Sequence, residues 1–93
     1  MNSQQMDPDL SVIIVTWNTK QMLADCLRSV KGNLQDLNIE TFVVDNGSTD
    51  GSALMVREDF PEVTLIANQR NEGFAKANNQ AIRLSDGRYI LLL

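Results

Sequence analysis

The sequence predicts an α/β fold with a mainly parallel sheet and helices on both faces of the strands. Short runs of β-branched and other apolar residues alternate along the chain with segments whose apolar residues recur at helical spacing. The first two apolar runs also end in clusters of polar and turn-forming residues. Strands that alternate with helices pair in parallel through right-handed crossovers, which predicts a three-layer, Rossmann-like half-domain.

The first half of the chain contains two expected strands and two expected helices. The strands are predicted over residues 10–16 and 39–44, where β-branched and apolar residues dominate. The helix between them is expected to end at Gly32, a glycine in the place of a C′ residue. Its apolar face is predicted to contain Met22, Leu23, Cys26, Leu27 and Val30. A second helix is predicted over residues 50–59, with Leu54, Met55 and Val56 as its apolar residues, and Pro61 ends it.

The second half repeats this order. A third strand over residues 62–67 leads into a polar loop over residues 68–73. A third helix is predicted over residues 74–85, and the residues available for burial in it are Phe74, Ala77, Ala81, Ile82 and Leu84. Asp86 and Gly87 then turn the chain into a fourth strand over residues 88–93.

Composition excludes several classes of function. The net charge is −4 and no cluster of Lys or Arg occurs, so we expect no nucleic-acid partner. One cysteine, Cys26, permits no intrachain disulfide. Residues 1–9 are polar and are expected to form a flexible segment. They lack the apolar core of a signal peptide, and no run is long enough to span a membrane, so a cytoplasmic location is expected.

Residues 42–51 are the most informative stretch, because a short apolar run leads directly into Asp45 and a dense turn cluster. Open α/β folds bind ligands in the crevice outside the carboxyl ends of their strands, so this pattern predicts a nucleotide site. From turn chemistry alone, capping of the next helix by Asp45 or Asp50 explains the pattern equally well.

Four segments in order resemble the N-terminal part of a family 2 glycosyltransferase with the GT-A fold, and a rhamnosyltransferase-like subgroup is one reading of this resemblance. They are residues 11–18, 44–51, 71–75 with 77–79, and 87–93. The resemblance implies the strand order 3-2-1-4. It also implies that residues 10–93 are the nucleotide-sugar-binding half of a GT-A domain, truncated before the acidic metal-binding motif. A divalent cation, Mg²⁺ or Mn²⁺, is therefore expected in the full-length protein, with neither the cation nor the catalytic base held by this chain.

The resemblance implies six donor-binding residues: Thr16, Asn18, Asp45, Asn46, Gly73 and Asn79. Asp45 resembles an aspartate that reads the base or ribose, since a carboxylate accepts hydrogen bonds from both. Asn46 stands where many members carry a second acid, so contact between its amide and the base stays open.

Each of the other candidates has a structural alternative. Thr16 and Asn18 either face the base or cap the first helix. Gly73 lets the backbone approach a ligand closely, and Asn79 either lies near the nucleotide or faces solvent.

Four neighbouring residues are expected to have structural roles. Asp50 is predicted to cap the second helix and Phe74 to join the core. Trp17 either stacks on a ligand or packs against the fold, and packing is the expectation. Arg70 either approaches a phosphate or base from the loop or is exposed, and exposure is the expectation.

The predicted function is recognition of a UDP- or dTDP-sugar in an inverting glycosyltransferase that transfers a sugar to a hydroxyl of a sugar or lipid-linked acceptor. This chain alone is expected to be inactive. A Rossmann-type oxidoreductase or methyltransferase is disfavoured, because residues 16–20 contain no glycine. A non-catalytic flavodoxin-like or Rossmann-like domain, for nucleotide binding or interaction, is the remaining alternative. Strand 88–93 would have an open edge in this chain, so self-association through it is also expected.

Overall fold

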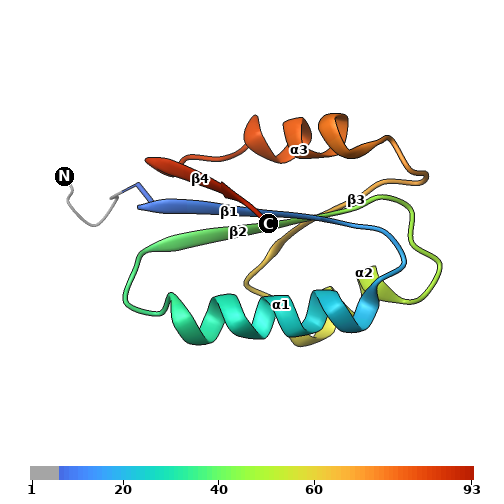
Figure 1. Cartoon of the computed structure of the whole chain (residues 1–93), viewed down its shortest axis with the longest axis horizontal. Helices are drawn as coiled ribbons and strands as arrows, with labels where there is room; N and C mark the ends of the chain where they lie inside the picture. Colours follow the sequence, from blue (N-terminus) through green and yellow to red (C-terminus); the bar gives the residue numbers. More distant parts are fainter. Residues whose placement is uncertain (1–6) are drawn as a thin grey trace.

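Four parallel strands form one sheet in the order β3-β2-β1-β4 in the computed structural model, which describes residues 7–93 (Figure 1). The strands are β1 (Leu10–Thr16), β2 (Ile39–Asp45), β3 (Thr64–Ala67) and β4 (Tyr89–Leu92). The helices that connect them are α1 (Lys20–Asn33), α2 (Ser52–Asp59) and α3 (Phe74–Ile82). The predicted α/β class, the parallel pairing and the strand order are confirmed.

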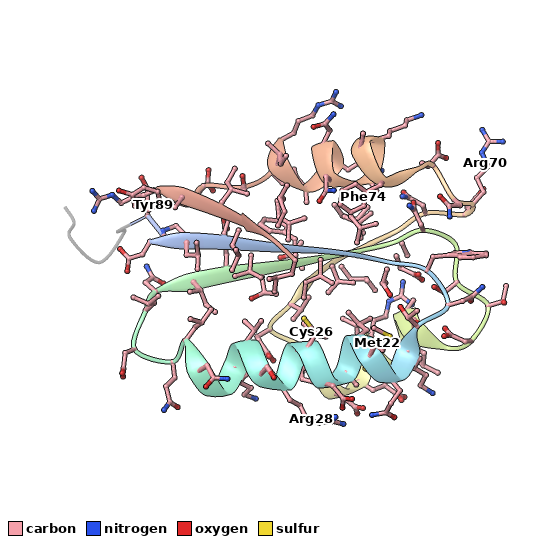
Figure 2. The ribbon with its side chains drawn as sticks, in the orientation of Figure 1. Met22, Cys26, Arg28, Arg70, Phe74 and Tyr89 are labelled. Carbon is pink, nitrogen blue, oxygen red and sulfur yellow. The ribbon has the colours of Figure 1, made fainter. Side chains whose placement is uncertain are left out.

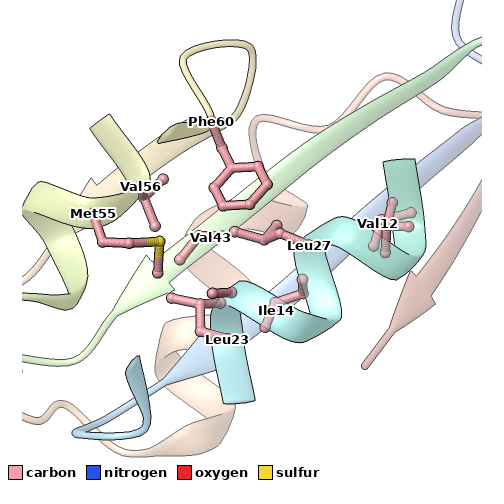
Figure 3. Close-up of a cluster of buried hydrophobic side chains, with 10 residues drawn as sticks. Val12, Ile14, Leu23, Leu27, Val43, Met55, Val56 and Phe60 are labelled. Atoms are coloured by element: carbon pink, nitrogen blue, oxygen red, sulfur yellow. The ribbon is translucent and has the colours of Figure 1, made fainter. Parts of the chain in front are cut away.

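Helices cover both faces of the sheet, with α1 and α2 on one side and α3 on the other (Figure 1). Successive strand residues point to opposite faces, so β1 and β2 are apolar on both. The buried cluster on the α1 and α2 side, shown in part in Figure 3, contains Val12, Ile14, Leu23, Ala24, Leu27, Val30, Val43, Met55, Val56 and Phe60. The cluster on the α3 side contains Ile13, Phe42, Val44, Ala77 and Ala81. Alanines four residues apart let the α3 backbone lie close to β1 and β2.

The prediction that Gly32 ends α1 was wrong. The helix continues to Asn33, and the N–H of Leu34 donates to the Val30 carbonyl at 3.1 Å. Gly32 therefore lies in the last turn, where glycine is tolerated at a cost in chain entropy.

The apolar faces of the helices are narrower than predicted. Leu23, Leu27 and Val30 are buried, whereas Met22 lies about 100° around α1 from Leu23 and is 71% exposed. Cys26, at the margin of the buried face, is half-buried. Leu54 and Leu84, each 56% exposed, also lie outside the core.

Some predicted element ends differ from the observed ones. Helix α3 stops at Ile82 rather than residue 85, because the hydroxyl and the N–H of Ser85 both donate to the Ile82 carbonyl, at 2.7 and 3.1 Å. Helix α2 starts at Ser52 rather than residue 50, and β3 at Thr64 rather than residue 62.

The N-terminal region runs beside the beginning of β4. Residues 1–6, part of the segment expected to be flexible, lie outside the described residues. The carbonyls of Pro8 and Asp9 accept hydrogen bonds from the N–H groups of Arg88 and Tyr89, at 3.1 and 3.2 Å. Within residues 7–93, none of the helices has the length and apolar character needed to cross a bilayer.

Candidate functional site

The loops that follow β1, β2 and β3 gather at the carboxyl edge of the sheet, on the right in Figure 1. Backbone hydrogen bonds join the strands up to this edge: the Asn46 N–H donates to the Thr16 carbonyl at 2.9 Å, and the Asn68 N–H to the Asp45 carbonyl at 2.8 Å. Five of the six candidate residues, all except Asn79, lie in these strand ends and loops. This is the edge at which open α/β folds bind ligands.

Asp45 is the last residue of β2 and is only 3% exposed. Its Oδ1 accepts a hydrogen bond from the Ser48 N–H at 3.2 Å, so the carboxylate fixes the turn that follows the strand. In the sheet register it lies beside Thr16 of β1. The carboxylate is thus held in one orientation at the end of the two inner strands.

Thr16 and Asn18 do not cap α1 with their side chains. The buried Thr16 hydroxyl lies 2.9 Å from that of Thr19. The Asn18 Oδ1 instead accepts from the Thr49 N–H, and the Asn18 N–H donates to the Ser48 hydroxyl, both at 2.8 Å. Asn18 therefore ties the loop after β1 to the loop after β2, with a left-handed backbone at φ 51°, which asparagine tolerates.

The side chain of Asn46 turns away from solvent and is 2% exposed. Its Nδ2 donates to the Gly73 carbonyl at 3.3 Å, which brings these two candidate residues into contact. Gly73 precedes α3 with φ 87°, a conformation that favours glycine, and its N–H donates to the Asn71 Oδ1 at 2.8 Å.

Asn79 is exposed on α3. Among residues 7–93, no hydrogen bond joins its side chain to the other candidate residues. Within the described residues, no side-chain hydrogen bond therefore connects Asn79 to the loops around Asp45.

Asp50 connects the beginnings of two helices, which sequence reasoning only half predicted. Its Oδ1 accepts from the N–H and the hydroxyl of Ser52 at the start of α2, as expected for a capping residue. Its Oδ2 also accepts from the N–H of Lys20, the first residue of α1, at 3.0 Å. The hydrogen bond from the Ser52 hydroxyl holds the pKa of Asp50 below its ordinary value, and the backbone N–H groups act in the same direction.

Two predictions about aromatic residues near this edge were wrong. Trp17 was expected to pack and is 53% exposed, and Phe74 was expected in the core and is 64% exposed. Trp17 follows the last residue of β1 and Phe74 is the first residue of α3, so each lies beside a loop, where no other helix or strand of the described chain covers its side chain. The predicted exposure of Arg70 is confirmed, and its guanidinium points away from the fold (Figure 2).

The loop before α3 carries charge pairs at the surface. The Glu72 carboxylate accepts from Lys76 at 3.1 Å and from Arg70 at 3.4 Å. The hydrogen bond and charge of Lys76 lower the pKa of Glu72. Exposed pairs of this kind contribute little to stability.

Carboxylates are scattered over the described part of the chain. Within residues 7–93, no three Asp, Glu, Cys or His side chains gather in a way that could hold a metal ion.

An open groove of about 440 Å³ lies at the opposite end of the sheet, between the end of α1, the beginning of β2 and the segment before β3. Leu27, Val30, Phe60 and Val63 contribute apolar surface to it. None of the six candidate residues lines this groove. The polar loops at the carboxyl edge, and not this groove, are therefore the candidate site.

The family model of glycosyl transferase family 2 matches residues 11–93. The chain belongs to this family. The four segments that carried the resemblance lie within the matched range.

Two named bacterial proteins are similar to this chain in sequence. The chain is 28% identical to the minor teichoic acid biosynthesis protein GgaB of Bacillus subtilis, over all of this chain and 11% of that protein. It is 35% identical to the putative colanic acid biosynthesis glycosyl transferase WcaA of Escherichia coli K12, over 90% of this chain and 31% of that protein. The chain thus spans less than a third of either relative.

A solved glycosyltransferase structure is similar to this chain in fold. It is a mannosyltransferase from Pyrobaculum calidifontis in complex with GDP-Man and Mn²⁺, 31% identical, with a TM-score of 0.73 over 87% of this chain and 25% of that one. The four strands of this chain therefore have an arrangement found in a GT-A glycosyltransferase.

Proposed function

We propose that this chain binds the nucleoside part of a nucleotide-sugar donor within an inverting glycosyltransferase. The observation that carries the proposal is the buried Asp45 carboxylate at the carboxyl end of β2. In the sheet, β1 pairs with β2 on one side and with β4 on the other, so the strand order reverses its direction at β1. Asp45 lies beside the end of β1, and open α/β sheets bind ligands at such a reversal point.

The neighbouring groups fit a nucleoside. The Asp45 carboxylate can accept from a base N–H or a ribose hydroxyl. The half-exposed indole of Trp17, one residue beyond β1, offers an aromatic face on which a base could stack. Thr16 and Asn18 flank it and supply backbone and hydroxyl groups. Asn79 remains a predicted contact that this geometry does not support.

The similar mannosyltransferase contains GDP-Man and Mn²⁺, which supports a nucleoside diphosphate sugar as donor and a divalent cation, Mg²⁺ or Mn²⁺, in the complete enzyme. Because the described residues do not gather a set of metal ligands, we assign no step through the cation to them. Their proposed part is binding and orientation of the donor, not sugar transfer.

The reaction proposed for the complete enzyme is attack of an acceptor hydroxyl on the anomeric carbon from the face opposite the nucleotide. The bond between the anomeric carbon and the diphosphate breaks, the nucleoside diphosphate leaves with the electron pair, and a base outside this chain takes the hydroxyl proton. The names of the relatives, which refer to teichoic acid and colanic acid, support a sugar or lipid-linked acceptor of the cell envelope. The cytoplasmic location, with work at the inner face of the membrane, stays a prediction.

A titration of the chain with UDP, dTDP and GDP tests the donor site. Asp45→Asn keeps the oxygen that receives the Ser48 N–H but removes the charge. Loss of a charged hydrogen bond, roughly 1.5–3 kcal/mol, should weaken binding about 10- to 100-fold. Asp36→Asn, an exposed aspartate in the loop before β2, is the matched control and should bind like the parent.

Equal affinity of Asp45→Asn and the parent would assign Asp45 a purely structural role. If the parent binds none of the three nucleotides, the non-catalytic interaction domain becomes the better interpretation.

We also propose that β4 pairs with β4 of a second copy. β4 is an edge strand whose side chains are between 38% and 69% exposed. The N–H groups of Tyr89 and Leu93 bond to Asp9 and Ile13, so alternation directs the backbone groups of Ile90 and Leu92 to the open edge.

A further inference from the structure

The loop of residues 68–73 forms one wall of the carboxyl edge, between β3 and α3, and side-chain amides hold it. Asn46 reaches three of its residues. The Asn46 Oδ1 accepts from the Asn68 Nδ2 at 3.0 Å and from the Glu72 N–H at 3.2 Å, and its Nδ2 donates to the Gly73 carbonyl. One buried side chain therefore fixes both ends of the loop.

A second amide pair extends this contact to α3. Asn68 and Gln80 bond reciprocally: the Asn68 Nδ2 donates to the Gln80 Oε1 at 2.8 Å, and the Gln80 Nε2 to the Asn68 Oδ1 at 2.9 Å. Both hydrogens of the Asn68 amide are thus used, one toward Gln80 and one toward Asn46. The three amides form a continuous chain from β2 through the loop to α3.

The backbone beside Asn46 is shaped for the same contact. Gly47 has φ 83°, and a Cβ on it would lie 2.8 Å from the Cα of Arg70. The middle of the loop therefore rests against the backbone that follows Asp45, at a distance only glycine allows. The Asn68 N–H also donates to the Asp45 carbonyl at 2.8 Å, so a shift of the loop would act on the backbone of Asp45 and of the residues that follow it.

We infer that Asn46, Asn68 and Gln80 are positioning residues for the nucleotide site, because their amides hold the loop of residues 68–73 in place beside Asp45. Asn46 was among the six residues expected to bind the donor, and contact between its amide and the base was left open. Its amide oxygen and one amide hydrogen are instead engaged by the protein, whereas the Asp45 carboxylate accepts only from the Ser48 N–H within the described residues. The effect on nucleotide affinity rests on the proposed function; the effect on the loop does not.

Two measurements separate these effects. The first is hydrogen exchange of the Glu72 amide by NMR without nucleotide, and the second is nucleotide affinity by titration with UDP, dTDP and GDP. Asn46→Ala removes the acceptor of the Glu72 N–H, whereas Asn46→Asp keeps an oxygen there. Gln80→Ala breaks only the far end of the amide chain, and Gln35→Ala, an exposed glutamine before β2, is its matched control.

We expect Asn46→Ala, which removes three hydrogen bonds, and Gln80→Ala, which removes two, to speed exchange of the Glu72 amide. Because both act on the site through the loop, nucleotide binding should weaken only about two- to tenfold, a change of the size of one net hydrogen bond. Asn46→Asp should restore protection of that amide. The double variant should lose less affinity than the product of the single losses, because both act through Asn68.

Two results would contradict the inference, and a third would separate it from the proposed function. If Gln80→Ala behaves like Gln35→Ala in both measurements, the amides do not act together and the inference fails. If Asn46→Ala weakens binding while its loop stays protected, Asn46 contacts the ligand directly and the inference also fails. If the unmutated chain binds no nucleotide but the Glu72 amide exchanges faster in Asn46→Ala and Gln80→Ala, the role of the amides in holding the loop is supported and the proposed function is contradicted.

Discussion

Ser11 is fully buried, and its hydroxyl connects β1 to two other parts of the sheet. It donates to the Glu40 Oε2 of β2 at 2.6 Å and accepts from the Gly87 N–H at 2.8 Å. The same Glu40 oxygen accepts from the Asp86 N–H. A buried hydroxyl without partners would cost free energy, so this arrangement both satisfies Ser11 and draws the turn before β4 against β1.

The close approach makes Gly87 a sensitive position. A Cβ there would lie 2.5 Å from the Ser11 backbone nitrogen, so Gly87→Ala must push β1 and the turn apart. We expect it to lower the free energy of unfolding by about 1–3 kcal/mol, as overpacking does. Gly32→Ala is the control, because nothing lies within 4 Å of its added Cβ in α1, and it should raise stability by about 0.5–1 kcal/mol. Urea unfolding measures both, and similar effects of the two changes would contradict the steric argument.

At the scale of elements, Asp50 holds the N-termini of α1 and α2 together through one carboxylate. The first N–H groups of each helix have no partner within the helix, and they give its start a partial positive charge. Neither N-cap residue, Thr19 or Gly51, supplies a side-chain hydrogen bond to them. A carboxylate outside α2 that reaches both helices compensates for this. It also places the loop after β2 against the loop after β1.

The lowered pKa of Asp50 predicts how this contact depends on pH. A carboxyl group whose pKa is lower in the folded state stabilises the fold above its unfolded pKa of about 3.9, and this contribution disappears as the pH falls through the folded value. Asp50→Asn should therefore be less stable than the parent at pH 7, and the difference should shrink below about pH 4. Thermal unfolding between neutral and acidic pH checks this, with Asp36→Asn as control. A difference that stays constant with pH would show that the charge of Asp50 does not contribute.

For the whole molecule, the two edges of the sheet differ in their protection. β3 packs against α2 and has its two middle residues half-buried, whereas Tyr89, Ile90, Leu91 and Leu92 of β4 are all exposed. Within described residues, this strand carries no charged side chain that would discourage edge pairing. Such a strand is a template for another chain.

We expect the chain to associate with increasing concentration, by pairing of β4 with its copy. Ile90→Lys places a charge on the open strand, where the side chain is already 45% exposed, and should shift the population to monomer. Light scattering over a concentration series measures this, and circular dichroism confirms that the variant is folded. Lys76→Ala, an exposed change on α3, should associate like the parent. A parent that stays monomeric at high concentration would contradict the proposal.

The sequence by itself determined the order of elements, the parallel sheet and the place of Asp45. Apolar periodicity and turn residues are local signals, so they identify strands and helices even without the rest of the fold. Four short segments in order were also enough to identify the family and, through it, the strand order. The carboxyl-edge location of five candidate residues then follows, because parallel strands end at the same edge.

Only the tertiary structure decided which side chains are covered and which polar groups are already used. Periodicity placed Phe74 and Met22 on apolar faces, but burial depends on whether another element lies opposite, and none covers them. The bond of Asp50 to Lys20 and those of Asn46 to Glu72 and Gly73 join residues 26 to 30 positions apart. A local pattern carries no information about such partners, because they meet only when the strands align and bring their loops to one edge. For the same reason Asn46 looks like a ligand contact in the sequence and has its amide engaged by the loop in the folded chain.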